Sequence, residues 1–195
     1  MAEADVTCQH ALPVTYTAAQ AMATQPAPGA LEAVRAFVNT WDEERGADAL
    51  ATPAALAAFF GVDATAADLR RAVALREALR AILAHHGGAP LDPAVPRTLD
   101  AAARRARLAV AFDAHGHAAP APRAPGVDGA LGRLLAIVAA AQADGTWERL
   151  KACPADDCRW AFYDRSRNRS SVWCDMQVCG NRAKARAFRA RGSTT

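Results

Sequence analysis

Residues 153–182 read CPADDCRWAFYDRSRNRSSVWCDMQVCGNR, and this stretch decides how the carboxyl-terminal part of the chain folds. It holds two cysteine pairs, each with four residues between its members, and fifteen residues separate the pairs. A tetrahedral four-thiolate site needs two such pairs, because each pair turns its chain around the ion and the insert brings the pairs together. The spacing predicts one structural zinc ion with the ligands Cys153, Cys158, Cys174 and Cys179.

Three other uses of these cysteines remain open. Disulfides would require an oxidising compartment, for which the chain shows no targeting signal. A redox pair more often has a two-residue spacer, and an iron–sulfur cluster has other spacings. Zinc is favoured over all three, and four protein thiolates would close its coordination sphere and leave no position for a catalytic water. The remaining cysteine, Cys8, is isolated, and we assign it no function.

The sequence around the cysteines predicts a small ββα module of treble-clef type. Residues 159–164 and 171–174 are rich in strand-forming residues, and the run NRAKARAFRAR from Asn181 favours a helix. A miniature core would consist of the aromatic side chains Trp160, Phe162 and Trp173.

Positive charge is concentrated in this module. Residues 151–195 contain ten Lys and Arg but four Asp and Glu, a net charge of +6, so the first 150 residues carry −3 of the chain's total of +3. This asymmetry is typical of a nucleic-acid-binding module on an acidic body, although charge also serves solubility alone. We predict nucleic-acid contacts from Arg165, Arg167, Arg169, Arg182, Lys184, Arg186 and Arg189.

These basic residues should form two stripes. If residues 165–169 are extended, their three arginines project to one side. On the following helix the spacing places three arginines on one face and three alanines on another, and the alanine face can lie close to the hairpin. The helix stripe consists of Arg182, Arg186 and Arg189, and the small face consists of Ala183, Ala187 and Ala190.

The residues before the module predict a mainly α domain with one small β hairpin. Apolar residues recur at helical spacing, with an N-cap at Thr52 and a capping box from Thr65 to Asp68. Residues 91–96 are expected to form a loop, and strand-like alternation at 108–112 is followed by an expected turn at 115–117. The expected helices cover residues 30–39, 53–60, 66–86, 98–106 and 127–143.

Polar residues of this domain cluster in one loop, which could form an effector site or, as a third reading, an enzyme site. The five residues are Asn39, Thr40, Asp42, Arg45 and Asp48. Polar loops more often cap helices, and the chain has no phosphate-binding glycine loop and no nucleophile elbow, so we predict no enzymatic activity. Neither His85 with His86 nor His115 with His117 is assigned a metal.

The amino-terminal sequence indicates the cellular compartment in which the protein is expected. No run of apolar residues is long enough to span a membrane, and the first residues have acids where a secretory signal needs bases. We therefore expect a cytoplasmic protein without membrane association. Residues 1–28 are expected to form a loosely ordered leader.

At CGNR, Cys179 to Arg182, the chain resembles the CGNR zinc-finger family. The C-x4-C spacing and the segment YDRSRNRSSVWC of this chain are part of the same resemblance. The stretch AFVNTWDEERGADALATPAALAAFF, from Ala36, is similar to the opening motif of the ABATE domain that usually precedes this finger. The resemblance implies a bacterial transcriptional regulator, with an ABATE-like helical domain at 29–146 that senses stress or an effector and a DNA-binding zinc finger at 147–195.

The resemblance also implies that the four cysteines bind zinc and that Asn181 and Arg182 form a signature pair. On physical grounds Gly180 would allow tight backbone passage, Asn181 could cap a helix or turn, and Arg182 could either neutralise the thiolates or contact phosphate. The expected function is therefore a zinc-containing DNA-binding regulator with a small-molecule effector, and homodimerisation stays open. The alternative is a zinc-stabilised RNA-binding or protein-interaction module.

Overall fold

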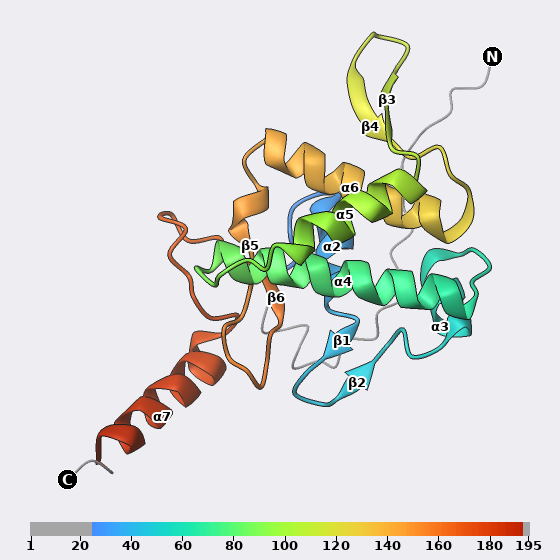
Figure 1. The fold of residues 1–195 in the computed structure, drawn as a ribbon. Coiled ribbons are helices and arrows are strands. Elements are labelled where there is room, and N and C mark those ends of the chain that lie inside the picture. Colours follow the sequence, from blue (N-terminus) through green and yellow to red (C-terminus); the bar gives the residue numbers. More distant parts are fainter. Residues whose placement is uncertain (1–24, 193–195) are drawn as a thin grey trace.

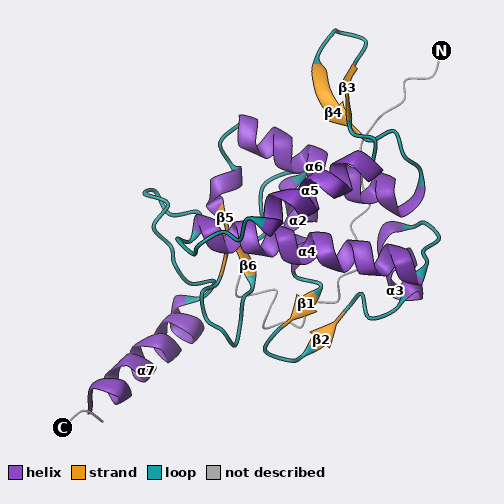
Figure 2. Cartoon of the chain, in the orientation of Figure 1, coloured by secondary structure: helices purple, strands orange, loops and turns teal. Residues whose placement is uncertain are grey.

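A computed structural model describes residues 25–192, and about half of these are helical (Figures 1 and 2). The predicted leader falls almost entirely outside the described residues, as does Cys8. Five helices form the body around a shared core, with the long α4 at its centre. They are α2 (Leu31–Val38), α3 (Pro53–Phe60), α4 (Ala66–His86), α5 (Ala94–Arg105) and α6 (Gly126–Ala143).

Three two-stranded antiparallel sheets accompany the helices, which confirms a mainly helical fold with small sheets. They are β1 (Trp41–Asp42) with β2 (Ala47–Asp48), β3 (Ala109–Phe112) with β4 (Ala118–Ala121), and β5 (Leu150–Ala152) with β6 (Ala161–Tyr163). The short helix η1 (Trp147–Arg149) leads into β5, and the π-helical turn η2 (Met176–Gly180) leads into α7 (Asn181–Gly192).

The predicted helix starts are confirmed by their caps. The Thr52 hydroxyl accepts a hydrogen bond from the Ala55 amide at 3.1 Å, and Gly61 ends α3 in the left-handed region at a φ of 67°. At α4 the capping box is complete, because Thr65 and Asp68 each accept from the other's amide. Local side-chain chemistry therefore sets these boundaries.

The start of α5 differs from the prediction. The helix begins at Ala94 and includes Pro96, which the sequence places in a loop. Proline is tolerated there because the amides of a first helical turn have no partner within the helix. A proline near the start of a helix was thus misread as a loop boundary.

The helix α6 is long and apolar enough to pass a length and composition test for a membrane span, but half of it is buried inside the protein. Its buried side chains include Leu131 and Leu134, which belong to the same core as Phe37 and Leu79. The helix therefore belongs to the core of the body.

The predicted hairpin at 108–121 forms, with Asp113 to His117 as its turn, and it projects from the body (Figure 1). The large apolar side chains of β3 do not join the core, since Val110 is 62% exposed and Phe112 is 72% exposed, whereas Leu108 just before the strand packs against the core. The alternation of apolar residues at 108–112 predicted the strand correctly, but it did not show whether the apolar face of the strand would be buried.

Candidate metal centre

The hairpin β5–β6 positions the first cysteine pair at its turn. The Cys153 amide donates to the Trp160 carbonyl at 2.9 Å, and the Cys158 amide donates to the Ala155 carbonyl at 2.9 Å. Arg159 follows with a φ of 52°, a conformation that turns the chain back into β6. The partner of β6 is therefore β5, and the predicted strand at 171–174 is wrong, because that segment is a loop.

The turn η2 positions the second pair. The Asp175 carboxylate accepts hydrogen bonds from the amides of Gln177 and Val178, at 2.6 and 3.1 Å, and so caps the turn between Cys174 and Cys179. At Gly180 a Cβ atom would clash with the sulfur of Met176 and lie 3.2 Å from Trp173. The expectation that the backbone passes close to its neighbours at Gly180 is confirmed. The side chain that caps the turn beside the cysteines is that of Asp175, not that of Asn181.

All four sulfurs come together, and their spacing fits a tetrahedral metal. The ligand atoms lie within 4.8 Å of one another, with 3.5 Å between Cys158 and Cys174 and 3.7 Å between Cys174 and Cys179. Zn–S bonds of about 2.3 Å in a tetrahedron place the sulfurs about 3.8 Å apart, whereas a disulfide would require about 2.05 Å. The cysteines are free thiols, and their packing fits zinc.

Of the thiols of Cys153, Cys158 and Cys174, only that of Cys153 ionises readily without a cation. Hydrogen bonds from Cys158 and Cys174 lower the pKa of Cys153 to about 2, and the contacts with Cys153 raise the pKa of both partners. One negative charge can be shared here, but four adjacent thiolates require a positive ion at their centre. Zinc bound by all four would supply that charge and hold the two halves of the module together.

Aromatic side chains and small residues complete the second, smaller core around the sulfurs. Trp160 and Ala155 are buried with three of the cysteines, and Trp173 packs against them. The prediction of an aromatic core is therefore confirmed for Trp160 and Trp173, which come from two loops. Phe162, on β6, is buried but does not belong to this cluster.

The signature arginine, Arg182, lies at the metal centre. Its Nη2 donates to the Cys179 sulfur at 3.5 Å, and its Nη1 donates to Glu44 at 2.9 Å and lies 3.5 Å from Asp157. Contact with Cys179, and then with Glu44, raises the pKa of Arg182. Of the two roles considered for this residue, the geometry favours neutralising the thiolates.

We predict that Arg182→Gln weakens zinc retention by about 10- to 100-fold, the usual effect of losing a side chain that supports a metal ligand. Competition with a zinc-sensitive chelator would measure it. The control Arg186→Gln also removes a contact with Asp157, but the arginine is not bonded to a sulfur. If both variants retain zinc like the wild type, Arg182 does not support the site.

The arginines Arg165, Arg167 and Arg169 do not form the predicted stripe. Residues 164–170 make a turn, in which Arg169 has a φ of 54°. Arg165 lies over the Tyr163 ring at 5.5 Å and donates to the Pro26 carbonyl at 2.7 Å. The arginine side chains are exposed around a turn, so the assumption of an extended segment was wrong.

A buried ion pair that sequence reasoning missed holds this turn. The Lys151 ammonium donates to Asp164 at 2.7 Å and to the carbonyl of Arg169 at 2.6 Å. Asp164 accepts from the amides of Ser166 and Ser171 as well. Burial alone would raise the pKa of Asp164, but these hydrogen bonds, first that of Lys151, lower it overall.

The last helix, α7, is present as predicted and extends away from the body (Figure 1). Most of its small face is exposed, at Ala187 and Ala190, whereas Ala183, in the first turn, is half-buried. The prediction that this face lies on the hairpin is wrong beyond that turn. Arg186 pairs with Asp157 at 3.3 Å, whereas Lys184 and Arg189 lie on exposed stretches of the helix.

The predicted effector loop is mostly engaged in structural contacts. Asn39 is buried and brackets the backbone of Ala161, and Thr40 and Asp48 both bind the buried guanidinium of Arg76, with Asp48 at 2.7 and 3.0 Å. Asp42 and Arg45, the other two members, lie 3.5 Å apart as an ion pair. Asn39 thus joins the body to the zinc module.

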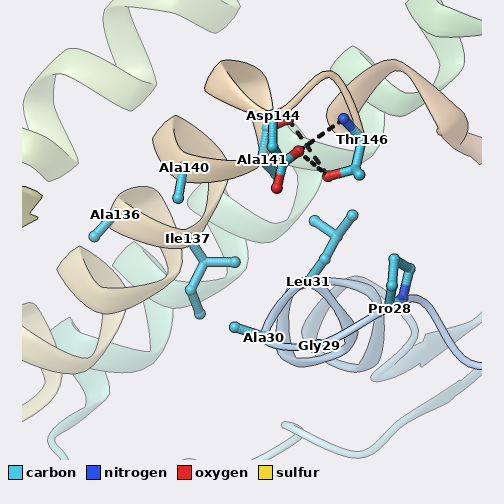
Figure 3. A pocket seen from close by; sticks show the side chains of 10 residues that line it. All are labelled: Pro28, Gly29, Ala30, Leu31, Ala136, Ile137, Ala140, Ala141, Asp144 and Thr146. Atoms are coloured by element: carbon cyan, nitrogen blue, oxygen red, sulfur yellow. Dashed lines mark hydrogen bonds between the residues drawn. The ribbon is translucent and has the colours of Figure 1, made fainter.

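A separate pocket of about 440 Å³ lies between the start of α2 and the second half of α6 (Figure 3). Its wall is mainly apolar, with Leu31 and Ile137 among the lining side chains. The polar residues at its edge, Asp144 and Thr146, are hydrogen-bonded to each other at 2.9 Å and at 2.5 Å. None of the five predicted effector-loop residues lines this pocket.

Comparison with known families places two domains on this structure. Residues 31–145 match the ABATE family, described as "Putative stress-induced transcription regulator", and residues 149–192 match the CGNR zinc finger. The families and their order confirm the resemblance expected from the sequence. The CGNR match and the sulfur geometry together indicate zinc binding. No curated protein matches the chain.

Proposed function

The chain belongs to the ABATE family, and on this premise we propose that it is a zinc-dependent DNA-binding transcription regulator of the cytoplasm. The observation that supports this proposal most directly is a basic surface on the zinc module. It consists of the exposed turn at 164–170 and the projecting helix α7. A helix with so little buried surface gains little from packing, so its arginines and lysine serve an external partner better than the fold.

The basic residues divide into two roles under this proposal. Arg182 serves the metal centre, because it is bonded to Cys179 and to Glu44. Phosphate contacts fall to the exposed residues, since guanidinium groups match phosphate oxygens and a module fixed by zinc presents them without further ordering. The exposed set is Arg165, Arg167, Arg169, Lys184, Arg186 and Arg189.

The body supplies the regulatory half of the proposal. The pocket between α2 and α6 suits a small, mainly apolar effector, since its walls are apolar and its edge carries polar groups. An effector there would act on the module through the shared core, which contains Leu31 of the pocket wall and Leu150 of β5. We propose no catalytic role for the described residues.

We predict that the zinc-loaded protein binds duplex DNA at low salt and loses affinity steeply as salt rises. Arg167→Gln should reduce the slope of log K against log salt by about 0.9, because one phosphate contact is lost. The control Arg70→Gln removes the same charge from an exposed position on α4 and should leave the slope unchanged. Fluorescence anisotropy at several salt concentrations measures both.

Two results would contradict the proposal. One is the absence of duplex binding by the zinc-loaded protein at low salt. The other is a clear preference for single-stranded RNA in competition, which would make the module an RNA-binding one.

A further inference from the structure

The hairpin β3–β4 exposes an apolar face that no other part of residues 25–192 covers. Val110 and Phe112 of β3 are cross-strand neighbours of Pro120 and Ala118 of β4, so these four side chains share one face of the sheet. Val110 is 62% exposed and Phe112 is 72% exposed. A two-stranded hairpin is only marginally stable by itself, so an uncovered apolar face of this kind calls for a partner.

The backbone determines which edge of the hairpin can accept that partner. The Asp113 amide donates to the His117 carbonyl, so this is a hydrogen-bonded pair. Because such pairs alternate along an antiparallel ladder, Ala111 and Ala109 also point their amides inward, and those of Val110 and Phe112 point outward. The outer edge of β3 therefore offers two N–H and two C=O groups.

The other edge is closed to pairing. Pro120 lies opposite Val110, at a position whose backbone faces the outer edge of β4, and proline has no amide to donate there. The strand β4 also lies along α6. Pairing can thus extend the sheet from β3 but not from β4.

We propose that β3 pairs with β3 of a second copy of the chain, antiparallel about a two-fold axis, to give a continuous four-stranded sheet. Centred on Ala111, this pairing sets Val110 of each copy opposite Phe112 of the other, and the outward amides and carbonyls of both residues are satisfied. The two apolar faces then join on the same side of the sheet.

Charge supports a second copy as the occupant. The strand itself is uncharged, and its two ends carry opposite signs, with Arg107 at the base and Asp113 at the tip. An antiparallel two-fold arrangement brings the tip of each hairpin toward the base of the other, so each end of the interface combines opposite charges. A parallel arrangement would place like charges together.

The test is the mass of the zinc-loaded full chain, measured by sedimentation over a range of concentrations. We expect a dimer, and Phe112→Lys should raise the dimer dissociation constant at least about 100-fold. Val110→Pro should do the same, because it removes an outward amide and leaves the inner ladder intact. Phe188→Lys is the control, since Phe188 is equally exposed, at 73%, but lies on α7.

A monomer at every concentration would overturn the proposal, as would a dimer that survives both hairpin variants or one that Phe188→Lys disrupts. Circular dichroism of each variant confirms that the fold is kept, which the exposure of the substituted side chains favours. The outcome is independent of DNA binding, because the dimer is measured without nucleic acid.

Discussion

Cys158→Ser, or removal of zinc with a chelator, is expected to unfold the part of the module that depends on the smaller core while leaving the body folded. The knuckle at 154–159 and the segment 172–192 surround the sulfurs, and their contacts with the body include polar ones made by Arg159 and Arg182. In zinc-finger peptides metal binding contributes about 10–16 kcal/mol, far more than this small apolar cluster could replace. Hydrogen exchange measured by mass spectrometry should show both segments losing protection.

The unfolding should stop at the strands that belong to the core of the body. Leu150, Ala152 and Ala161 belong to the core of the body, so β5 and β6 should remain protected although the CGNR match includes them. Cys8→Ser is the control, because it removes a cysteine that is not part of the tetrad. Metal analysis should give one zinc per wild-type chain and less than one for Cys158→Ser. Unchanged exchange after complete zinc removal would refute a structural role for the metal.

DNA binding should be lost with the metal under the proposed function. The turn at 164–170 is anchored partly by Lys151 and can stay ordered. The helix α7, by contrast, follows directly on η2 at the metal centre, and Arg182 in its first turn contacts Glu44 of the body. A chelated protein that still binds duplex DNA as tightly would show that α7 contributes nothing.

The sequence predicted those features that depend on local chemistry. The caps at Thr52 and Thr65 and the close passage at Gly180 each follow from a few neighbouring residues, and all are present. The clustering of the four cysteines could also be predicted, because a spacing that suits a metal leaves few alternatives.

Features that depend on distant partners could not be predicted. Nothing in the sequence near Ala161 shows that β6 pairs with β5, or that Asn39, 122 residues away, would bracket its backbone. The cluster of polar residues around Asn39 was read as a loop for an effector because burial is not visible in a polar sequence. Arg76, the partner of Asp48 in this cluster, lies 28 residues further along the chain, too far for a local pattern to connect the two.

The same limit explains the arginines between the cysteine pairs. Alternation of Arg165, Arg167 and Arg169 indicates a strand only if the chain is extended, and the turn is imposed by a lysine that lies before the first cysteine. Alternation is evidence for a strand when one face is apolar, whereas here the residues between the arginines are Ser166 and Asn168.

Breaking the buried pair of Lys151 and Asp164 is expected to be the most destabilising change outside the metal ligands. Both side chains are almost inaccessible, and Asp164→Leu leaves an ammonium group in the protein without a counter-charge. Loss of one partner of a buried pair typically costs about 3–5 kcal/mol. Urea denaturation of the zinc-loaded protein should show a shift of that size in the free energy of unfolding.

The double variant measures the interaction energy between the two charges. If the two charges stabilise each other, Lys151→Met with Asp164→Leu should cost less than the sum of the single variants by about 1–3 kcal/mol, because neither charge is then left unpaired. The recovery should be incomplete, since the carbonyl of Arg169 and the amides of Ser166 and Ser171 lose their partners as well. Strict additivity would show that the two residues act independently.

The pH dependence of Asp164→Asn provides a further check on the same pair. The pKa of Asp164 is lowered in the folded protein, so its carboxylate stabilises the fold above the unfolded value of about 3.9, and that stability is lost as the pH falls below it. Between pH 5 and 7 the carboxylate is ionised in both states. The gap in unfolding free energy between wild type and Asp164→Asn should therefore stay constant across this window, whereas a gap that narrows as the pH rises would mean that the pKa of Asp164 is raised instead.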